Sequence, residues 1–184
     1  MVVQSTKIIS IFKSKNKKKM TANTDFQRKG SLWVFSQILG FKNYPNVDDS
    51  ETVGKAVLVC AKGDGVLDPA ERDWQVGFFS ALGAPESLLE KLEIYDANDD
   101  LAELLANSSD RIKNLVQRDI VYQAIKASAA DGDYSEQEHK KICQMAELLG
   151  VTSDVVAQLV ELHKEEEQLR EKRIKLIFPK GSPY

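Results

Sequence analysis

The chain contains one stretch of sequence twice, and this internal repeat restricts the possible folds more than any other feature. Residues 60–85 and 127–152 align without a gap at an offset of 67 positions. The identical pairs are Asp64 and Asp131, Gly65 and Gly132, Glu71 and Glu138, Leu82 and Leu149, and Gly83 and Gly150. A gapless match of this length predicts that the protein is built from two copies of one helix–loop–helix unit.

Each copy carries the signals of a helix start shortly after its Asp-Gly turn. In the first copy, Asp68 is expected to cap a helix, Pro69 stands in its first turn, and Glu71 completes a capping box. In the second copy, Ser135 and Glu138 have the same spacing. Both helices are expected to end at the last pair of repeated glycines, because glycine adopts the left-handed conformation at a helix end.

Apolar residues recur at helical spacing outside the repeat as well, and no stretch alternates in the manner of a strand. The fold class is therefore predicted to be all-α, a compact multi-helix bundle built from two repeated helix–loop–helix units. Helices are expected over residues 26–41, 48–62, 68–83, 85–95, 99–106, 110–130, 135–149 and from 152 onward. We divide the chain into a basic, disordered leader (1–24), a helical domain (25–163) and a charged C-terminal helix extension with its tail (164–184).

Charge is distributed unevenly along the 184 residues. Residues 1–19 carry six lysines and no acidic residue, so the remainder carries a net charge of −9 against −3 for the whole chain. An acidic folded part suits cation binding or basic protein partners and argues against nucleic acid along its surface. The basic leader suits either peripheral contact with an anionic membrane surface or targeting to an organelle. No apolar run approaches the ~20 residues that cross a bilayer, and we expect a cytoplasmic protein.

The two Asp-Gly turns resemble the second half of an EF-hand calcium loop, with Asp at loop position 5, Gly at 6 and Glu at 12. The first half is missing, because Cys60 and Ala127 stand at position 1 and Lys62 and Ala129 at position 3. A self-contained EF-hand is therefore excluded. Two half-sites can still pool their oxygens around a divalent cation, calcium or magnesium. The candidate metal ligands are Asp64, Asp68, Glu71, Asp131, Asp133 and Glu138.

The same residues also have structural roles that need no metal. Gly after Asp allows a positive φ in the turn, Asp68 and Ser135 bind free amides, and Glu in the first helical turn interacts with the helix dipole. Capping alone does not require Asp64 or Asp131, which favours the metal hypothesis. The alternative is a metal-free interaction scaffold, in which the leader and the charged helix 164–175 bind partners or a membrane surface.

Helical pairs around the pattern ADGxxxxxE resemble the TerB family of tellurite resistance and the related N-terminal domain of some DnaJ-type membrane co-chaperones. The matching stretches are residues 62–71 and 130–138. The resemblance implies a compact helical, non-enzymatic stress-response module with an acidic cluster that binds divalent metal. The residues it implies as ligands are Asp64, Glu71, Asp131 and Glu138. The chain departs from the pattern at Lys62-Gly63, where the ammonium group of Lys62 is expected to weaken the first half-site.

No sequence motif of catalysis is present: the chain has no Walker A loop, no HExxH and no nucleophile elbow. An enzyme that acts through the acidic cluster is the remaining alternative. His139 and His163 have no partner at ligand spacing and are interpreted as surface histidines. Cys60 and Cys143 form no CxxC motif, so we interpret both as buried apolar residues in a reducing compartment.

Overall fold

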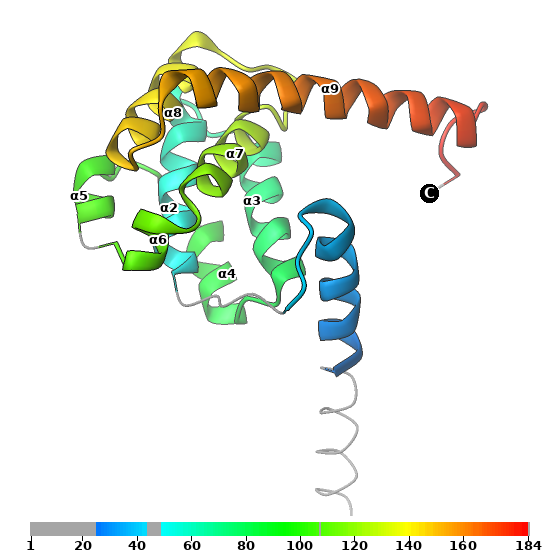
Figure 1. The fold of residues 1–184 in the computed structure, drawn as a ribbon, viewed down its shortest axis with the longest axis horizontal. Coiled ribbons are helices and arrows are strands. Elements are labelled where there is room, and N and C mark those ends of the chain that lie inside the picture. Colours follow the sequence, from blue (N-terminus) through cyan, green and yellow to red (C-terminus); the bar gives the residue numbers. More distant parts are fainter. Residues whose placement is uncertain (1–24, 44–48, 107, 184) are drawn as a thin grey trace, which may run out of the picture.

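The computed structural model describes residues 25–43, 49–106 and 108–183. Two expectations lie outside the described residues: the basic leader over residues 1–24, and the start of the second helix at residue 48. The described residues form helices joined by short loops and include no strand, which confirms the all-α prediction (Figure 1).

A helix over residues 25–38 comes first in the described part of the chain, and the remaining elements follow in order. They are α2 (Ser50–Ala61), the 3-10 turn η1 (Lys62–Asp64), α3 (Pro69–Leu82), α4 (Glu86–Glu93), α5 (Leu101–Ala106), α6 (Asp110–Asn114), α7 (Gln117–Ser128), α8 (Glu136–Leu148) and α9 (Ser153–Ile177). The helix pairs α2–α3 and α7–α8 are the two repeated units.

Helix α2 forms the centre of the bundle. Every residue from Ala56 to Ala61 is buried, and α3, α7 and α8 all pack against this helix. Gly54 allows α3 and α4 to approach α2 closely, because a Cβ here would lie 2.7 Å from Phe79 Cε2 and 2.9 Å from Leu92 Cδ1. The two repeats thus share one core, with α2 of the first packed on α7 of the second.

The segment predicted as one helix over residues 110–130 is broken in two, and this prediction was wrong. Helix α6 ends at Asn114, and α7 begins at Gln117, with Leu115 and Val116 in non-helical conformations between them. The break allows Ile112 and Ile120 to be almost completely buried together, whereas Leu115 is 77% exposed. The spacing of apolar residues alone does not distinguish two short helices from one continuous helix.

The helix over residues 25–38 is attached to the bundle through aromatic side chains. Phe35 is buried, stacks on Phe41 at 5.8 Å and contacts the edge of Phe78 at 5.3 Å. Phe78 in turn stacks on Trp74 at 5.3 Å. At the other end of the chain, the 25-residue helix α9 packs on α7 and α8 and then extends beyond the bundle (Figure 1).

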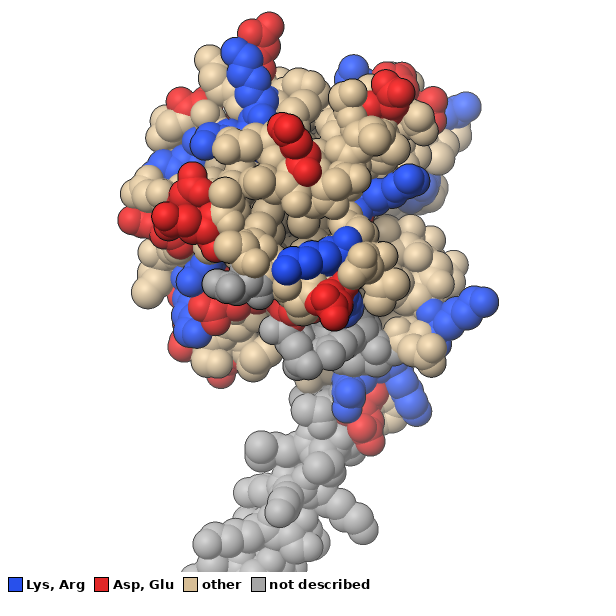
Figure 2. Space-filling model, turned by 60° about the vertical axis from the view of Figure 1, so that its left-hand side comes forward, with Lys and Arg blue, Asp and Glu red and all other residues tan. Residues whose placement is uncertain are grey.

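None of the helices in the described ranges combines the length and the apolar character needed to cross a membrane. Figure 2 shows acidic side chains interspersed with Lys and Arg on one face of the molecule. The acidic excess of the folded part is therefore not gathered into a single acidic patch on the face seen there.

Candidate carboxylate site

The two Asp-Gly turns have the same backbone conformation. Gly65 has φ +103° and Gly132 has φ +98°, values that an L-residue with a side chain adopts only with strain. One side-chain oxygen of Asp64 and of Asp131 accepts a hydrogen bond from the amide two residues further on, at 2.9 Å in both turns. The repeat identified in the sequence is therefore a structural repeat down to single hydrogen bonds.

Both predicted capping boxes are formed. The amide of Asp68 donates to Glu71 Oε2 at 2.8 Å, and the amide of Ser135 donates to Glu138 Oε2 at 2.6 Å. In the reverse direction, Ser135 Oγ accepts from the amide of Glu138 at 3.2 Å, and Asp68 Oδ1 accepts from the amide of Ala70 at 2.8 Å. These bonds fix the two glutamate side chains at the first turns of α3 and α8.

The fold brings these two glutamates together in the interior. Glu71 is 2% exposed and Glu138 is 5% exposed. The pKa of the Glu71 carboxyl is raised to about 8, first because of burial and then because of hydrogen-bonding contact with the Glu138 carboxyl. The negative charges of Glu138 and Asp131 add to the rise, whereas the hydrogen bond from the amide of Asp68 opposes it. At neutral pH the pair therefore retains a proton.

The pair can form because the first turn lies directly against the start of α8. A Cβ on Gly63 would lie 2.7 Å from the Cα of Glu138 and 2.9 Å from the carbonyl oxygen of Gln137. These neighbours are backbone atoms of a helix and cannot move aside as a flexible side chain can. Gly63, which differs from the equivalent Ala130 of the second repeat, is thus the residue that lets the first turn contact the start of α8.

Lys62, expected to repel a cation from the first half-site, is bound elsewhere. Its Nζ donates to the carbonyl oxygen of Asp96 at 2.8 Å and to Asn98 Oδ1 at 2.7 Å, both in the loop between α4 and α5. The ammonium group is therefore held by two hydrogen bonds to that loop. It would have to break both bonds to approach the carboxylates of the first half-site.

The six predicted ligands do not share one environment. Glu71 and Glu138 are buried together, and the charge of Asp131 acts on Glu71. Asp64, Asp131 and Asp133 are exposed, and Asp68 is half-buried. Within the described ranges, no group of three or more His, Cys, Asp or Glu side chains is arranged to hold a metal ion. The ligand role of the six residues therefore stays a prediction.

A second polar cluster, on α8, was missed by the sequence interpretation. His139 is half-buried, with Nδ1 3.1 Å from Tyr134 Oη and Nε2 3.5 Å from Cys143 Sγ. The interpretation of His139 as a plain surface residue was therefore wrong, and Cys143 is only half-buried. The spacing of His139 and Cys143, four residues apart on one helix face, was the available signal. Cys60 is buried, as expected.

Comparison with solved structures identifies one similar protein. It is a tellurite resistance protein from Nostoc punctiforme PCC 73102, known from a crystal structure, with which the chain shares 41% sequence identity at a TM-score of 0.75. The match covers 87% of this chain and 99% of that protein. None of the protein-family models searched matches the chain. The search of curated proteins likewise gave no match.

Proposed function

Because this chain belongs to the TerB-like family of tellurite resistance proteins, we propose that it is a non-catalytic stress-response module that binds a divalent cation at the Glu71–Glu138 pair. One observation carries the proposal: the fold buries two carboxyl groups, one from each repeat, in direct contact. Burying two carboxylates side by side is unfavourable unless a proton or a cation neutralises them.

A cation would take the place of the shared proton. Glu71 and Glu138 each use Oε2 to accept from a capping amide, which leaves Oε1 of each for the ion. Asp131 adds a third negative charge near Glu71. Magnesium is commonly held by one or two carboxylates and several waters, whereas calcium takes six to eight oxygens. The donor set therefore suits magnesium better than calcium.

The ion would act as a link within the fold. It would join the first turn of α3 to the first turn of α8, and thus the first repeat to the second. Binding would release the shared proton, so affinity is expected to increase as the pH rises through about 8. The bound ion would supply charge neutralisation and a cross-link.

Thermal unfolding with magnesium, with calcium and with EDTA tests this proposal. We expect the parent protein to melt at a higher temperature with magnesium, since a ligand at ~100 times its Kd adds about 2.7 kcal/mol to the free energy of unfolding. The double variant Glu71→Gln, Glu138→Gln keeps the side-chain shapes and should lose the response. The control is Glu136→Gln, which removes an exposed carboxylate from the same turn of α8. Equal responses of parent and double variant, or none from the parent, would refute the proposal.

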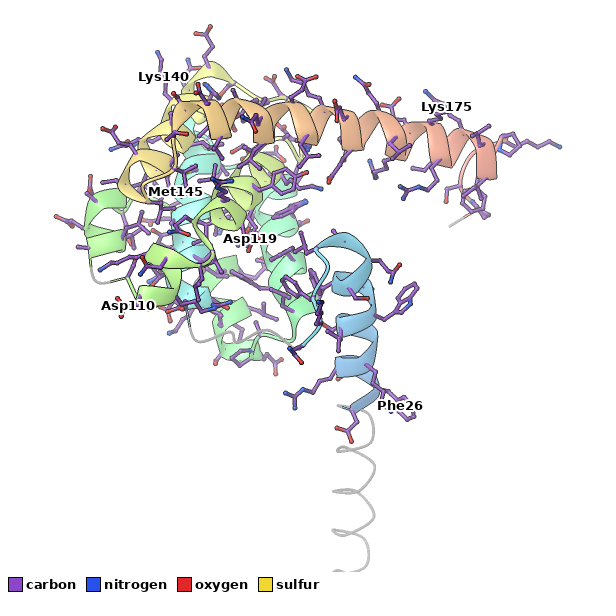
Figure 3. The ribbon with its side chains drawn as sticks, in the orientation of Figure 1. Phe26, Asp110, Asp119, Lys140, Met145 and Lys175 are labelled. Carbon is purple, nitrogen blue, oxygen red and sulfur yellow. The ribbon has the colours of Figure 1, made fainter. Side chains whose placement is uncertain are left out.

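A second function, docking at an anionic membrane surface, is favoured by the outer face of the helix over residues 25–38. Phe26 is 70% exposed and Trp33 is 67% exposed, and one heptad separates them, which places them on the same face. Lys29 Nζ lies 5.5 Å from the Phe26 ring centroid. Figure 3 shows Phe26 pointing away from the bundle. Aromatic and basic side chains on one exposed helix face are typical of segments that bind lipid headgroups.

A further inference from the structure

A cavity of about 280 Å³ lies where the helix over residues 25–38 meets α3 and α7 (Figure 1). Its walls are mainly aromatic: Phe35 comes from the first helix, Trp74 and Phe78 from α3, and Tyr122 from α7. The Phe78 ring stacks on Trp74 and meets Phe35 edge to face, so the walls support one another across two helices. Aromatic walls with few polar groups are typical of small-molecule sites, and a volume at the low end of their range suits a ligand with one ring.

An acidic side chain, Asp119 of α7, lines this largely apolar cavity (labelled in Figure 3). Lys126, the other charged residue that lines it in the described part of the chain, is already neutralised, because its Nζ lies 2.8 Å from Glu166 Oε2. Arg111 acts on Asp119 through its charge. Its guanidinium, however, is paired with Asp49, with Nη1 and Oδ2 3.5 Å apart. Both of these cations therefore have acidic partners of their own.

Burial disfavours the negative charge of Asp119. It raises the pKa of this carboxyl, and the hydrogen bond from Gln123 and the charge of Arg111 offset only part of the rise. A buried carboxylate is stabilised by hydrogen-bond donors and by a positive charge in contact with it. Gln123 supplies a donor without charge, since its Nε2 lies 2.9 Å from Asp119 Oδ2. A ligand can add the positive charge.

Gln123 fixes the position of this carboxylate. The glutamine lines the same cavity and is 6% exposed, and its Oε1 is buried without a hydrogen-bond partner among the described residues. An unpaired buried carbonyl oxygen is unfavourable. Reversing the amide would place this oxygen against the carboxylate, so the donor has to stay on Asp119. The glutamine is therefore a positioning residue, which binds Oδ2 and leaves Oδ1 of Asp119 for a ligand.

We propose that this cavity binds a small primary amine with an aromatic body. The ammonium group donates to Asp119 Oδ1 and supplies the positive charge, and the ring packs against Trp74 and Phe78. Aromatic faces also attract the ammonium group itself. Asp119 repels an anionic ligand, and a neutral ligand buries the carboxylate further without compensating its charge.

Besides Arg111, two cations, Lys42 and Arg118, line a neighbouring cavity of about 560 Å³, which shares Asp119 and Tyr122 with the first. Lys42 and Arg118 are both exposed. Water and salt screen exposed charges, whereas Asp119 acts on a ligand at short range between the aromatic walls. Asp119 therefore sets the sign of the charge that the aromatic cavity prefers.

Calorimetric titration of the full-length protein with three probes of similar shape tests this inference: phenethylamine, phenethyl alcohol and hydrocinnamate. We expect saturable binding of one phenethylamine per chain. The alcohol and the anion should bind at least about tenfold more weakly, because each lacks the charge-assisted hydrogen bond to Asp119. In the Trp33→Phe variant, Trp74 is the remaining tryptophan of the chain, so a change in its fluorescence would place the amine in this cavity.

Asp119→Asn keeps the shape of the side chain and removes its charge. We expect its affinity for phenethylamine to fall about tenfold, to the level of the alcohol. Asp73→Asn, which removes an exposed carboxylate next to Trp74 in α3, is the matched control and should bind like the parent. Glu71→Gln with Glu138→Gln should also bind the amine like the parent, because the aromatic cavity is separate from the proposed cation site.

Ala81→Phe is the deciding variant if Asp119→Asn does not fold. Ala81 lines the cavity but is exposed, so a larger side chain can fill the cavity without entering the core. A folded Ala81→Phe protein, checked by thermal unfolding, should not bind the amine. Hydrocinnamate that binds as tightly as phenethylamine would overturn the inference. So would a parent without saturable amine binding, or folded cavity variants that bind like the parent.

Discussion

At the scale of single residues, Glu71 and Glu138 each have two roles. Each caps its own helix through one carboxyl oxygen, and each faces the carboxyl of the other repeat. Capping explains why a glutamate occurs at this place in both repeats. It does not account for the burial of both side chains in contact, which is unfavourable for ionised carboxylates.

The raised pKa of Glu71 predicts a loss of stability with increasing pH when no metal is present. The pKa rises from an ordinary 4.5 to about 8 on folding, so between these values the folded state binds a proton that the unfolded state has released. The free energy of unfolding should therefore fall across this window, by at most about 1.4 kcal/mol per pH unit.

Urea unfolding in EDTA at several pH values between 5 and 9 measures this slope. In Glu71→Gln the slope should be flatter, because no carboxyl titrates at that position. Glu136→Gln, which removes an exposed carboxylate on α8, should keep the parent's slope. Parallel curves for the parent and Glu71→Gln would show that the buried pair does not hold the proton.

At the scale of elements, the contact between η1 and the start of α8 decides whether the two carboxyl groups meet. The contact depends on Gly63, whose missing side chain leaves room for the backbone at Glu138. The equivalent residue of the second repeat is Ala130, so the two turns are not interchangeable. The chain is repeated in sequence, but the packing of its turns is asymmetric.

Gly63→Ala should destabilise the protein by about 1–3 kcal/mol, the usual range for forcing an extra methyl group into a packed site. The added Cβ would lie 2.7 Å from the Cα of Glu138, and this contact can be relieved only if η1 and α8 separate. Chemical denaturation measures the change.

Gly77→Ala is the matched control for this substitution. Gly77 lies in α3, and a Cβ there would have no neighbour within 4 Å. This change should stabilise the protein by up to about 1 kcal/mol, because alanine favours the helix. Equal effects of the two substitutions would mean that the close approach at Gly63 is not needed for stability.

At the scale of the whole molecule, charge is distributed unevenly along the chain. Residues 1–43 contain nine basic residues and one acidic residue, whereas residues 44–184 contain 16 basic and 27 acidic residues. The helix over residues 25–38, with its exposed Phe26 and Trp33, belongs to the basic part. An anionic lipid surface would attract this part of the molecule and repel the rest, which would orient the protein.

Co-sedimentation with vesicles tests the lipid proposal. We expect the full-length protein to sediment with vesicles that contain phosphatidylserine, less so at high salt, and not with pure phosphatidylcholine. Phe26→Ala with Trp33→Ala should weaken sedimentation, whereas Leu169→Ala, which removes an apolar residue from α9 that is 57% exposed, should not. Equal sedimentation of all variants would contradict the proposal. If the parent protein self-associates and the double variant does not, this helix face binds a second copy of the chain rather than a lipid surface.

The sequence by itself determined the local structure of this protein. The capping boxes, the positive-φ glycines and the two helix–loop–helix units depend on interactions between residues a few positions apart, and those interactions can be recognised from spacing. The same reasoning did not find the break between α6 and α7, because the burial of Ile112 and Ile120 depends on neighbours distant in sequence.

The tertiary structure alone decided which acidic residues meet. The sequence offered six carboxylates as candidate ligands, but the packing of η1 on α8 buries Glu71 against Glu138 and leaves Asp64 and Asp133 at the surface. The tertiary structure also decided that Cys143 lines a surface cavity whereas Cys60 is buried in the core. Exposure and the approach of distant charges arise from contacts between elements, and residue spacing within one element carries no information about them.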